Sequence, residues 1–397
     1  MNQSLAENRN RISSIDVLRG IIMIIMALDH TRDYFHEDAI LGSPTNMDTT
    51  TPILFFTRWI THFCAPVFVF LSGVAVYING QKKTKKELSI YLIKRGVWLI
   101  FAEAVIMTFV LSFNPKYNII FLAVIWAIGW SMIILGLLVR SSYKLIAVIG
   151  ILLFFFHNIL DFAKLPQQGA ASALWQLFFT SPGSFFPLGE GRGVLLGYAI
   201  FPWTGVMLMG YTAGYLFKKD FDPAKRKKLL IIAGLSLIGL FILLRVINIY
   251  GDPSPWSTQK NTTLTFLSFL NVTKYPVSLQ FCCMALGPAL LLLAVLETTS
   301  NRLTRFANVY GRVPFFYFVL HFLLIHILCM IAFFATGHSF AEATDPRSPF
   351  LFRPAEFGFS LGVVYLVWLS VVLLMYYPNR WFGKYKQTHR QWWLSYL

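Results

Sequence analysis

Long apolar segments recur along almost the whole chain, and they restrict its possible folds more than any other feature. About 20 apolar residues are enough to cross a bilayer as a helix. Inside a bilayer every backbone N–H and C=O must be bonded within the segment, which favours helices. The pattern predicts an all-α polytopic membrane protein, a bundle of about ten transmembrane helices, at 15–35, 53–78, 89–111, 118–138, 143–162, 193–217, 229–247, 275–297, 313–335 and 356–377.

The charge content excludes a large aqueous domain. Only 13% of the residues are charged, against about a quarter in soluble domains. The net charge of +16 does not indicate nucleic-acid binding, because the basic residues lie in short loops between apolar segments, where they set membrane orientation. The four cysteines lie inside apolar runs and predict buried thiols without a metal site. We therefore expect one transmembrane domain over residues 1–397.

The distribution of basic residues predicts the orientation. Most of the 34 lysines and arginines fall on the side of the two termini, which the positive-inside rule places in the cytoplasm. Residues 1–14 and 378–397 are then cytoplasmic tails. The start of the chain lacks a signal-peptide pattern, so the first apolar segment is expected to remain as an anchor. The longer loops lie on the outer side, where we expect the substrate, at 36–52, 163–192, 250–274 and 336–355.

Residues 13–36, SSIDVLRGIIMIIMALDHTRDYFH, hold the first candidate site. Arg19 and His30 are eleven residues apart, so they share one face of a helix and lie roughly 16 Å apart along its axis. Ionisable residues inside a membrane span indicate function. Arg19 is a candidate phosphate ligand; alternatively it pairs with Asp16 or extends to the membrane surface.

His30 is the leading candidate for a catalytic group. It follows Asp29 and precedes Asp33, and an imidazole held by a carboxylate is a common general base. The alternative is a structural histidine that is hydrogen-bonded inside the bundle. His36 is the second catalytic candidate, at the outer end of the same segment.

Further polar residues lie near the outer ends of other apolar segments. Arg58 and His62, four residues apart, share a helix face and are expected to bind substrate; alternatively they lie in the headgroup layer. Lys274 and Tyr275 begin another apolar segment, with Lys274 directed at an anionic ligand or at lipid headgroups. Glu103 and Arg245 are expected to form a structural ion pair.

The ordered set of segments resembles the heparan-α-glucosaminide N-acetyltransferase catalytic-domain family, in its bacterial branch. The Arg19–His30 spacing is also similar to that of the wider membrane acyltransferase superfamily. The segments that carry the resemblance are RISSIDVLRG (11–20), LDHTRDYF (28–35), THFCAPVFVFLSG (61–73), FLNVTKYPVSLQF (269–281), GRVPFFYFVLH (311–321) and WFGKYKQTHRQWWLSYL (381–397).

The resemblance implies transfer of an acetyl or other acyl group from cytoplasmic acyl-CoA to an amine or hydroxyl of an extracytoplasmic sugar or glycolipid. His30 would act as general base or acyl carrier, with Asp29 and Asp33 beside it. In the eukaryotic members the implicated histidine lies nearer in sequence to His36, so both histidines stay open. The residues expected to bind the co-substrate acetyl-CoA or another acyl-CoA are Arg19, Lys274, Tyr275 and Arg312.

The resemblance also implies a location and partners. We expect the bacterial inner membrane, a cell-envelope glycan or glycolipid as acceptor, a homodimer as one possible assembly, and no metal. The alternative function is a multi-helix transporter of an anionic or amphipathic solute, which often shows internal repeats. No convincing repeat is present in the sequence. A non-catalytic scaffold is a third reading, and it predicts that Arg19 and His30 are replaceable.

Overall fold

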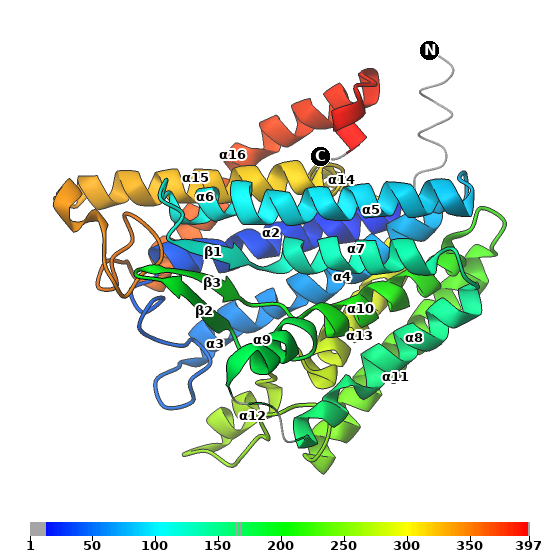
Figure 1. Cartoon of the computed structure of the whole chain (residues 1–397), viewed down its shortest axis with the longest axis horizontal. Coiled ribbons are helices and arrows are strands. Elements are labelled where there is room, and N and C mark those ends of the chain that lie inside the picture. The colour runs from blue at the N-terminus through cyan, green and yellow to red at the C-terminus, as the bar shows by residue number, and fades with distance from the viewer. Residues whose placement is uncertain (1–12, 164–165, 167, 396–397) are drawn as a thin grey trace.

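A computed structural model of the protein describes residues 13–163, 166 and 168–395 (Figure 1). Within these residues the fold is mainly helical, which confirms the predicted class of an all-α membrane protein. Seven helical segments are long and apolar enough to cross a membrane. Of the two expected cytoplasmic tails, residues 1–12 and 396–397 lie outside the described part. The seven segments are Pro52–Gly80, Lys85–Ser112, Tyr143–Phe162, Pro223–Ile247, Leu279–Leu296, Pro314–Ala335 and Leu361–Thr388.

Some of these segments contain several helical pieces. The first is α3 (Pro52–Trp59), η1 (Ile60–Phe63) and α4 (Cys64–Gly80); the second is α5 (Lys85–Phe101), the π-helix η2 (Ala102–Met107) and α6 (Thr108–Ser112). The third is α8 (Tyr143–Phe156) and η3 (His157–Phe162). The others are α11 (Pro223–Ile247), α13 (Leu279–Leu296), α15 (Pro314–Ala335) and α16 (Leu361–Thr388), so helix α16 continues into the region expected to be a tail.

The other three expected spans also form helices, but they fall outside that set. Helix α2 (Ser13–Phe35) has 23 residues and carries charged residues near both ends. Helices α7 (Val124–Leu138) and α10 (Ile200–Ala213) have 15 and 14 residues. Their crossing of the membrane stays a prediction. The remaining short helices are α9 (Gly169–Phe178), η4 (Gly214–Phe217), α12 (Thr262–Leu270), α14 (Arg302–Gly311), η5 (Phe340–Ala343) and η6 (Trp392–Ser395).

A small sheet was not predicted. It contains β1 (Ile119–Leu122), β2 (Ser184–Gly189) and β3 (Arg192–Leu196) in the order β1-β3-β2. Strands β2 and β3 form a hairpin that turns at Gly189 and Gly191, both with positive φ, which glycine adopts readily. The expected spans 118–138 and 193–217 therefore begin with strands, because short apolar runs suit strand and helix alike.

Helix α2 lies in the interior of the bundle and positions both candidate sites. It packs against α4, α13, α14, α15 and α16. Gly20 allows a very close approach, because a Cβ there would lie 1.8 Å from the carbonyl oxygen of Ala307 in α14. Figure 1 shows the sheet and the loop after α2 at one end of the molecule. The two ends of α2 therefore lead to two separate parts of the structure.

Candidate functional site

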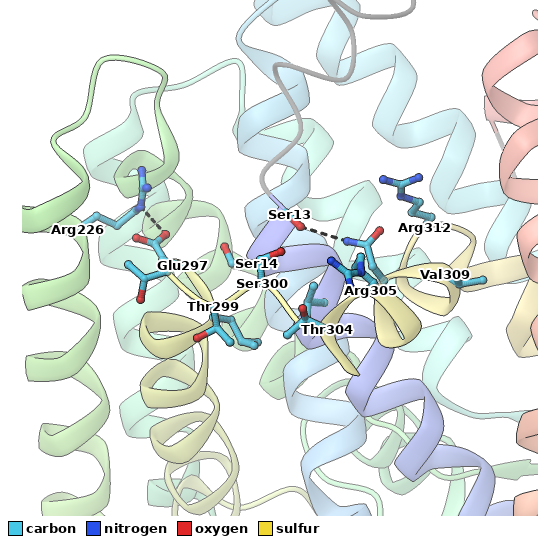
Figure 2. A pocket seen from close by; sticks show the side chains of 14 residues that line it. Ser13, Ser14, Arg226, Glu297, Thr299, Ser300, Thr304, Arg305, Val309 and Arg312 are labelled. Carbon is cyan, nitrogen blue, oxygen red and sulfur yellow. Dashed lines mark hydrogen bonds and ion pairs between the residues drawn. The ribbon is translucent and has the colours of Figure 1, made fainter. Parts of the chain in front are cut away.

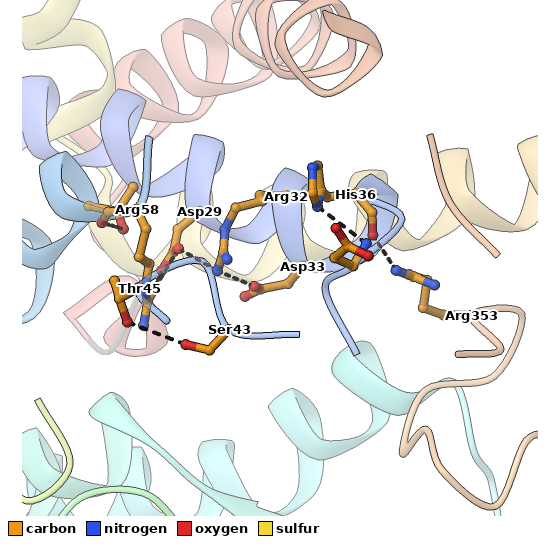
Figure 3. Close-up of polar contacts among 10 residues, drawn as sticks. Asp29, Arg32, Asp33, His36, Ser43, Thr45, Arg58 and Arg353 are labelled. Atoms are coloured by element: carbon orange, nitrogen blue, oxygen red, sulfur yellow. Dashed lines mark hydrogen bonds and ion pairs between the residues drawn. The ribbon is translucent and has the colours of Figure 1, made fainter. Parts of the chain in front are cut away.

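The C-terminal half of α2 carries a buried network of charged residues (Figure 3). Arg32 donates from Nη2 to Asp29 at 3.1 Å and to Asp33 at 2.6 Å. Arg58, from α3, binds Asp29 through both carboxylate oxygens. The Asp29 side chain is only 10% exposed, whereas that of Asp33 is 43% exposed. Two guanidinium groups therefore compensate the buried charge of Asp29, which is needed to keep a carboxylate ionised in an apolar surrounding.

This pairing differs from the contact expected for Asp29, whose catalytic role stays a prediction. The sequence predicted that Asp29 or Asp33 would hold the His30 imidazole. In the structure the bonds of Asp29 and Asp33 go to arginines, because a charged bidentate partner is stronger than a neutral ring.

His30 packs among the side chains of α15. Its ring centre lies 3.8 Å from that of Phe322, 5.2 Å from that of His321 and 6.4 Å from that of Phe318. Its Nδ1 is buried and has no hydrogen-bond partner among the described residues. A buried polar atom without a partner is costly, so it marks a place where a missing group can bind.

His62 and Lys274 border the same region, which we call the polar centre and define as Asp29, His30, Arg58, His62 and Lys274. The buried ring of His62 lies 5.4 Å from that of Phe281, and its Nδ1 also lacks a partner among the described residues. The positive charge of Lys274 acts electrostatically on Asp29, His30 and His62. Residues distant in sequence thus form one site.

The loop before α13 holds Lys274 in place. The Lys274 ammonium lies 5.2 Å from the ring centre of Tyr275 and 6.0 Å from that of Tyr198. Asp252 accepts hydrogen bonds from the Thr273 amide at 2.8 Å, the Thr273 hydroxyl at 2.7 Å and the Ser278 hydroxyl at 2.8 Å. This bracing fixes the direction from which Lys274 and Tyr275 approach the polar centre.

His36 lies just beyond α2, apart from the polar centre. Its Nδ1 accepts the amide hydrogen of Asp38 at 3.3 Å, and its backbone oxygen accepts from Arg353 at 2.6 Å. The side chain is 7% exposed, and this burial lowers the pKa of His36. Burial also lowers the pKa of Arg353. The local loop therefore bonds the Nδ1 of His36, whereas the Nδ1 of His30 has no partner among the described residues.

At the N-terminal end of α2 the structure contains a cavity of about 570 Å³, which we call the arginine pocket (Figure 2). Arg226 lines it and bonds Glu297 at 2.6 Å. Its lining is otherwise rich in hydroxyl groups and arginines, a composition suited to phosphate. The lining residues are Ser13, Ser14, Val17, Arg226, Leu296, Glu297, Thr298, Thr299, Ser300, Thr304, Arg305, Asn308, Val309 and Arg312.

The structure separates the four residues expected to bind acyl-CoA. Arg312 lines the arginine pocket. Arg19 does not line it: its Nη1 donates to Asp16 at 3.0 Å and to the carbonyl of Gly311 at 3.1 Å, which is the structural alternative. Lys274 and Tyr275 lie with the polar centre instead. Sequence reasoning missed the pocket residues Arg226 and Arg305, which lie in α11 and α14, although the basic segments that contain them were evident.

The expected ion pair between Glu103 and Arg245 is wrong. Arg245 donates to the carbonyls of Phe269 at 2.7 Å, Ser268 at 2.9 Å and Asn271 at 2.6 Å. Glu103 accepts the amide hydrogen of Ala123 at 3.2 Å, at the start of α7. Backbone groups that lack helical partners compete successfully for buried charges. Within the described residues no cluster of metal-ligating side chains occurs.

Comparison with known families gives a match over much of this structure. The family model described as "Heparan-alpha-glucosaminide N-acetyltransferase, catalytic" matches residues 11–245, which include α2 and every residue of the polar centre except Lys274. A comparison with curated proteins finds no match. Lys274, Tyr275 and Arg312 lie beyond the matched residues, so the resemblance there stays a prediction. The chain, an integral membrane protein with seven candidate spans, belongs to the family of the heparan-α-glucosaminide N-acetyltransferase catalytic domain.

Proposed function

We propose that the protein is a membrane acyltransferase that moves an acetyl or other acyl group from acyl-CoA to an amine or hydroxyl of an extracytoplasmic sugar or glycolipid. The observation that carries the proposal is the arrangement along α2. One end leads to the arginine pocket and the other half holds His30, whose Nδ1 is buried and unpartnered among the described residues. Family membership supports the reaction class.

The arginine pocket is the proposed site for the phosphates of acyl-CoA. Arg226, Arg305 and Arg312 give it three guanidinium groups, and Glu297 is its one acidic lining residue within the described chain. Arginine binds phosphate oxygens in a bidentate manner. Ser13 at the pocket and His30 are 17 residues apart on one helix, roughly 25 Å, a distance suited to an extended ligand. The thioester then reaches the polar centre.

In the proposed reaction His30 is the general base. As the O–H or N–H proton of the acceptor passes to His30, the acceptor atom bonds the thioester carbonyl carbon. The C–S bond then breaks, and the proton moves from His30 to the leaving thiolate. The products are CoA and an ester or amide. Lys274 and Arg58 supply positive charge where the carbonyl oxygen becomes negative. An acyl-histidine intermediate is the alternative route, and His36 is the alternative residue.

The acceptor side of the site is proposed at Arg58 and His62. Both residues lie near the expected outer end of their span, and their side chains belong to the polar centre. The Nδ1 of His62 has no partner among the described residues, so it can bond a hydroxyl group of the acceptor. A cell-envelope glycan or glycolipid of the bacterial inner membrane is the proposed acceptor class. Acyl-CoA enters from the cytoplasmic side in this arrangement, because the arginine pocket lies among the basic loops.

The proposal is tested by measuring acetyl-CoA binding and CoA release with detergent-purified protein. We expect His30→Ala to lower the rate of CoA release about 100-fold or more, because general-base catalysis is lost. We expect Arg312→Gln to raise KM about tenfold through a lost charged hydrogen bond. Arg380→Gln, at an exposed arginine of α16, is the matched control and should leave both constants unchanged.

Two results would overturn the proposal. The first is a well-folded wild-type protein that binds no acyl-CoA, which would favour the transporter instead. The second is a His30→Ala variant with the wild-type rate. Loss of activity in His36→Ala alone would place the chemistry in the loop after α2.

A further inference from the structure

We propose that His321 of α15 is a positioning residue for His30: it accepts the Nδ1 hydrogen of His30 and so leaves the His30 Nε2 as the base. This inference rests on the proposed function for its catalytic consequence. It concerns a residue outside the region matched by the family model.

The hydrogen bonds of His321 fix which of its nitrogens is an acceptor. Its Nδ1 lies 2.8 Å from the carbonyl oxygen of Tyr317, so Nδ1 must carry the hydrogen. In the neutral ring the Nε2 then carries no hydrogen, and its lone pair can accept a hydrogen bond. This Nε2 is buried and has no partner among the described residues, and the whole side chain is 0% exposed. The Nε2 of His321 is therefore a buried acceptor without a donor among the described residues.

His30 offers the matching donor. The two ring centres are 5.2 Å apart. Two imidazoles joined by an N–H···N bond of about 2.9 Å have ring centres about 5 Å apart, since each nitrogen lies about 1 Å from its ring centre. The Nδ1 of His30 is buried and unpartnered as well. A hydrogen bond between these two atoms would satisfy both, which removes the cost of two buried unpaired groups.

A second histidine of the same helix shows what a purely structural imidazole looks like here. His326 is also 0% exposed, but its Nδ1 lies 3.2 Å from the carbonyl oxygen of Val110 and its Nε2 lies 2.8 Å from that of Leu351, so the ring donates to one of the two. Both nitrogens lie against backbone oxygens. His321 differs from His326, on the same helix, because its Nε2 has no partner among the described residues.

The charged residues around His30 do not hydrogen-bond its ring, so we assign the orienting role to His321. Asp29, next to His30 in sequence, is bonded by Arg32 and Arg58. The charged groups that act on His30 are Asp29, Arg58 and Lys274, and none of them forms a hydrogen bond to its ring in the described structure. A neutral imidazole thus has the role that a carboxylate has in many acid–base pairs, which is to select the tautomer and direction of the catalytic ring.

The experiment compares His321→Phe with His321→Gln in detergent-purified protein, and uses His326→Gln as the matched control. Phenylalanine keeps the ring volume but cannot accept a hydrogen bond, whereas the glutamine side-chain carbonyl can occupy the place of Nε2. We expect His321→Phe to lower kcat for CoA release about 10- to 100-fold with little change in KM, the usual cost of losing an orienting partner. His321→Gln should recover most of this loss. His326→Gln should lower the unfolding temperature but not kcat.

A second readout does not need activity. In ¹⁵N-histidine NMR of the membrane-embedded protein, we expect His30 to carry its hydrogen on Nδ1 in the wild type and to change its tautomer balance in His321→Phe. An unchanged His30 spectrum together with wild-type kcat in His321→Phe would overturn the inference. A wild type that turns over no acyl-CoA would overturn the proposed function instead, while the spectrum still decides whether the two rings are joined.

Discussion

At the scale of single residues, two neighbouring histidines of similar sequence context have opposite surroundings. His30 lies against the aromatic side chains of α15, and its Nδ1 has no partner among the described residues, whereas the Nδ1 of His36 is bonded by its own loop. The sequence alone could not choose between them as the catalytic residue. The difference favours His30, because its ring lies in the polar centre, whereas His36 lies apart from the polar centre in the loop after α2.

The contact of His36 predicts a pH dependence of stability. Its Nδ1 accepts the Asp38 amide hydrogen, and burial lowers its pKa, so the folded protein resists protonation of this ring. Below about pH 6.5 the unfolded chain binds the proton more readily, and the stabilisation from His36 is lost as the pH falls toward the folded pKa. We expect His36→Asn, which keeps an acceptor but does not titrate, to unfold with a weaker pH dependence between pH 7.5 and 5. Thermal unfolding in detergent measures this, and identical pH profiles would contradict it.

At the scale of elements, the bundle depends on close crossings between helices at glycines. A Cβ at Gly20 of α2 would lie 1.8 Å from the Ala307 carbonyl oxygen of α14. A Cβ at Gly210 of α10 would lie 2.0 Å from that of Phe70 in α4. Small residues allow helices in membranes to pack at short distances, where contacts between side chains and backbone replace the missing hydrophobic effect. The crossing of α2 and α14 also sets one wall of the arginine pocket.

The crossing at Gly20 predicts a strong effect of one added methyl group. We expect Gly20→Ala to lower the free energy of unfolding by about 2 kcal/mol, because the carbonyl of Ala307 cannot yield without moving α14. Gly239→Ala is the control, since a Cβ at Gly239 in α11 meets nothing within 4 Å. Equal unfolding temperatures for the two variants would show that α2 and α14 separate easily.

At the scale of the whole molecule, the proposed reaction requires two openings on opposite sides of the membrane. The arginine pocket lies among loops that are rich in basic residues, and the sheet lies at the other end of α2 (Figure 1). The positive-inside rule places the pocket in the cytoplasm. This orientation stays a prediction, and the transfer of an acyl group from cytoplasmic acyl-CoA to an outer acceptor depends on it.

Single cysteines test the orientation directly. All four native cysteines are buried, so they give little background with a membrane-impermeant thiol reagent. We expect Glu190→Cys, in the exposed turn between β2 and β3, to react in intact cells. Asp220→Cys, in the exposed loop between α10 and α11, should react only after the membrane is opened. The reverse pattern would invert the topology and place the arginine pocket outside.

The sequence by itself determined the class of the fold and the central place of α2. Apolar length and the obligation to satisfy backbone hydrogen bonds are local properties, and they identified helices at all ten expected spans. The position of His30 deep in such a segment was equally visible, because a charged or titratable group there is costly. The strands before α7 and α10 were missed, since short apolar runs do not distinguish the two structures.

The tertiary structure alone decided which polar groups meet. In the folded protein the charge of Lys274 acts on His30, and Asp29 pairs with two arginines. Glu103 and Arg245 bind backbone groups instead of each other. Such pairings depend on where distant helices cross and on backbone carbonyls and amides that compete with side chains for each buried charge. Only the packed structure shows that His30 and His321 each keep a nitrogen without a partner among the described residues, because the lack of a partner depends on every neighbouring group.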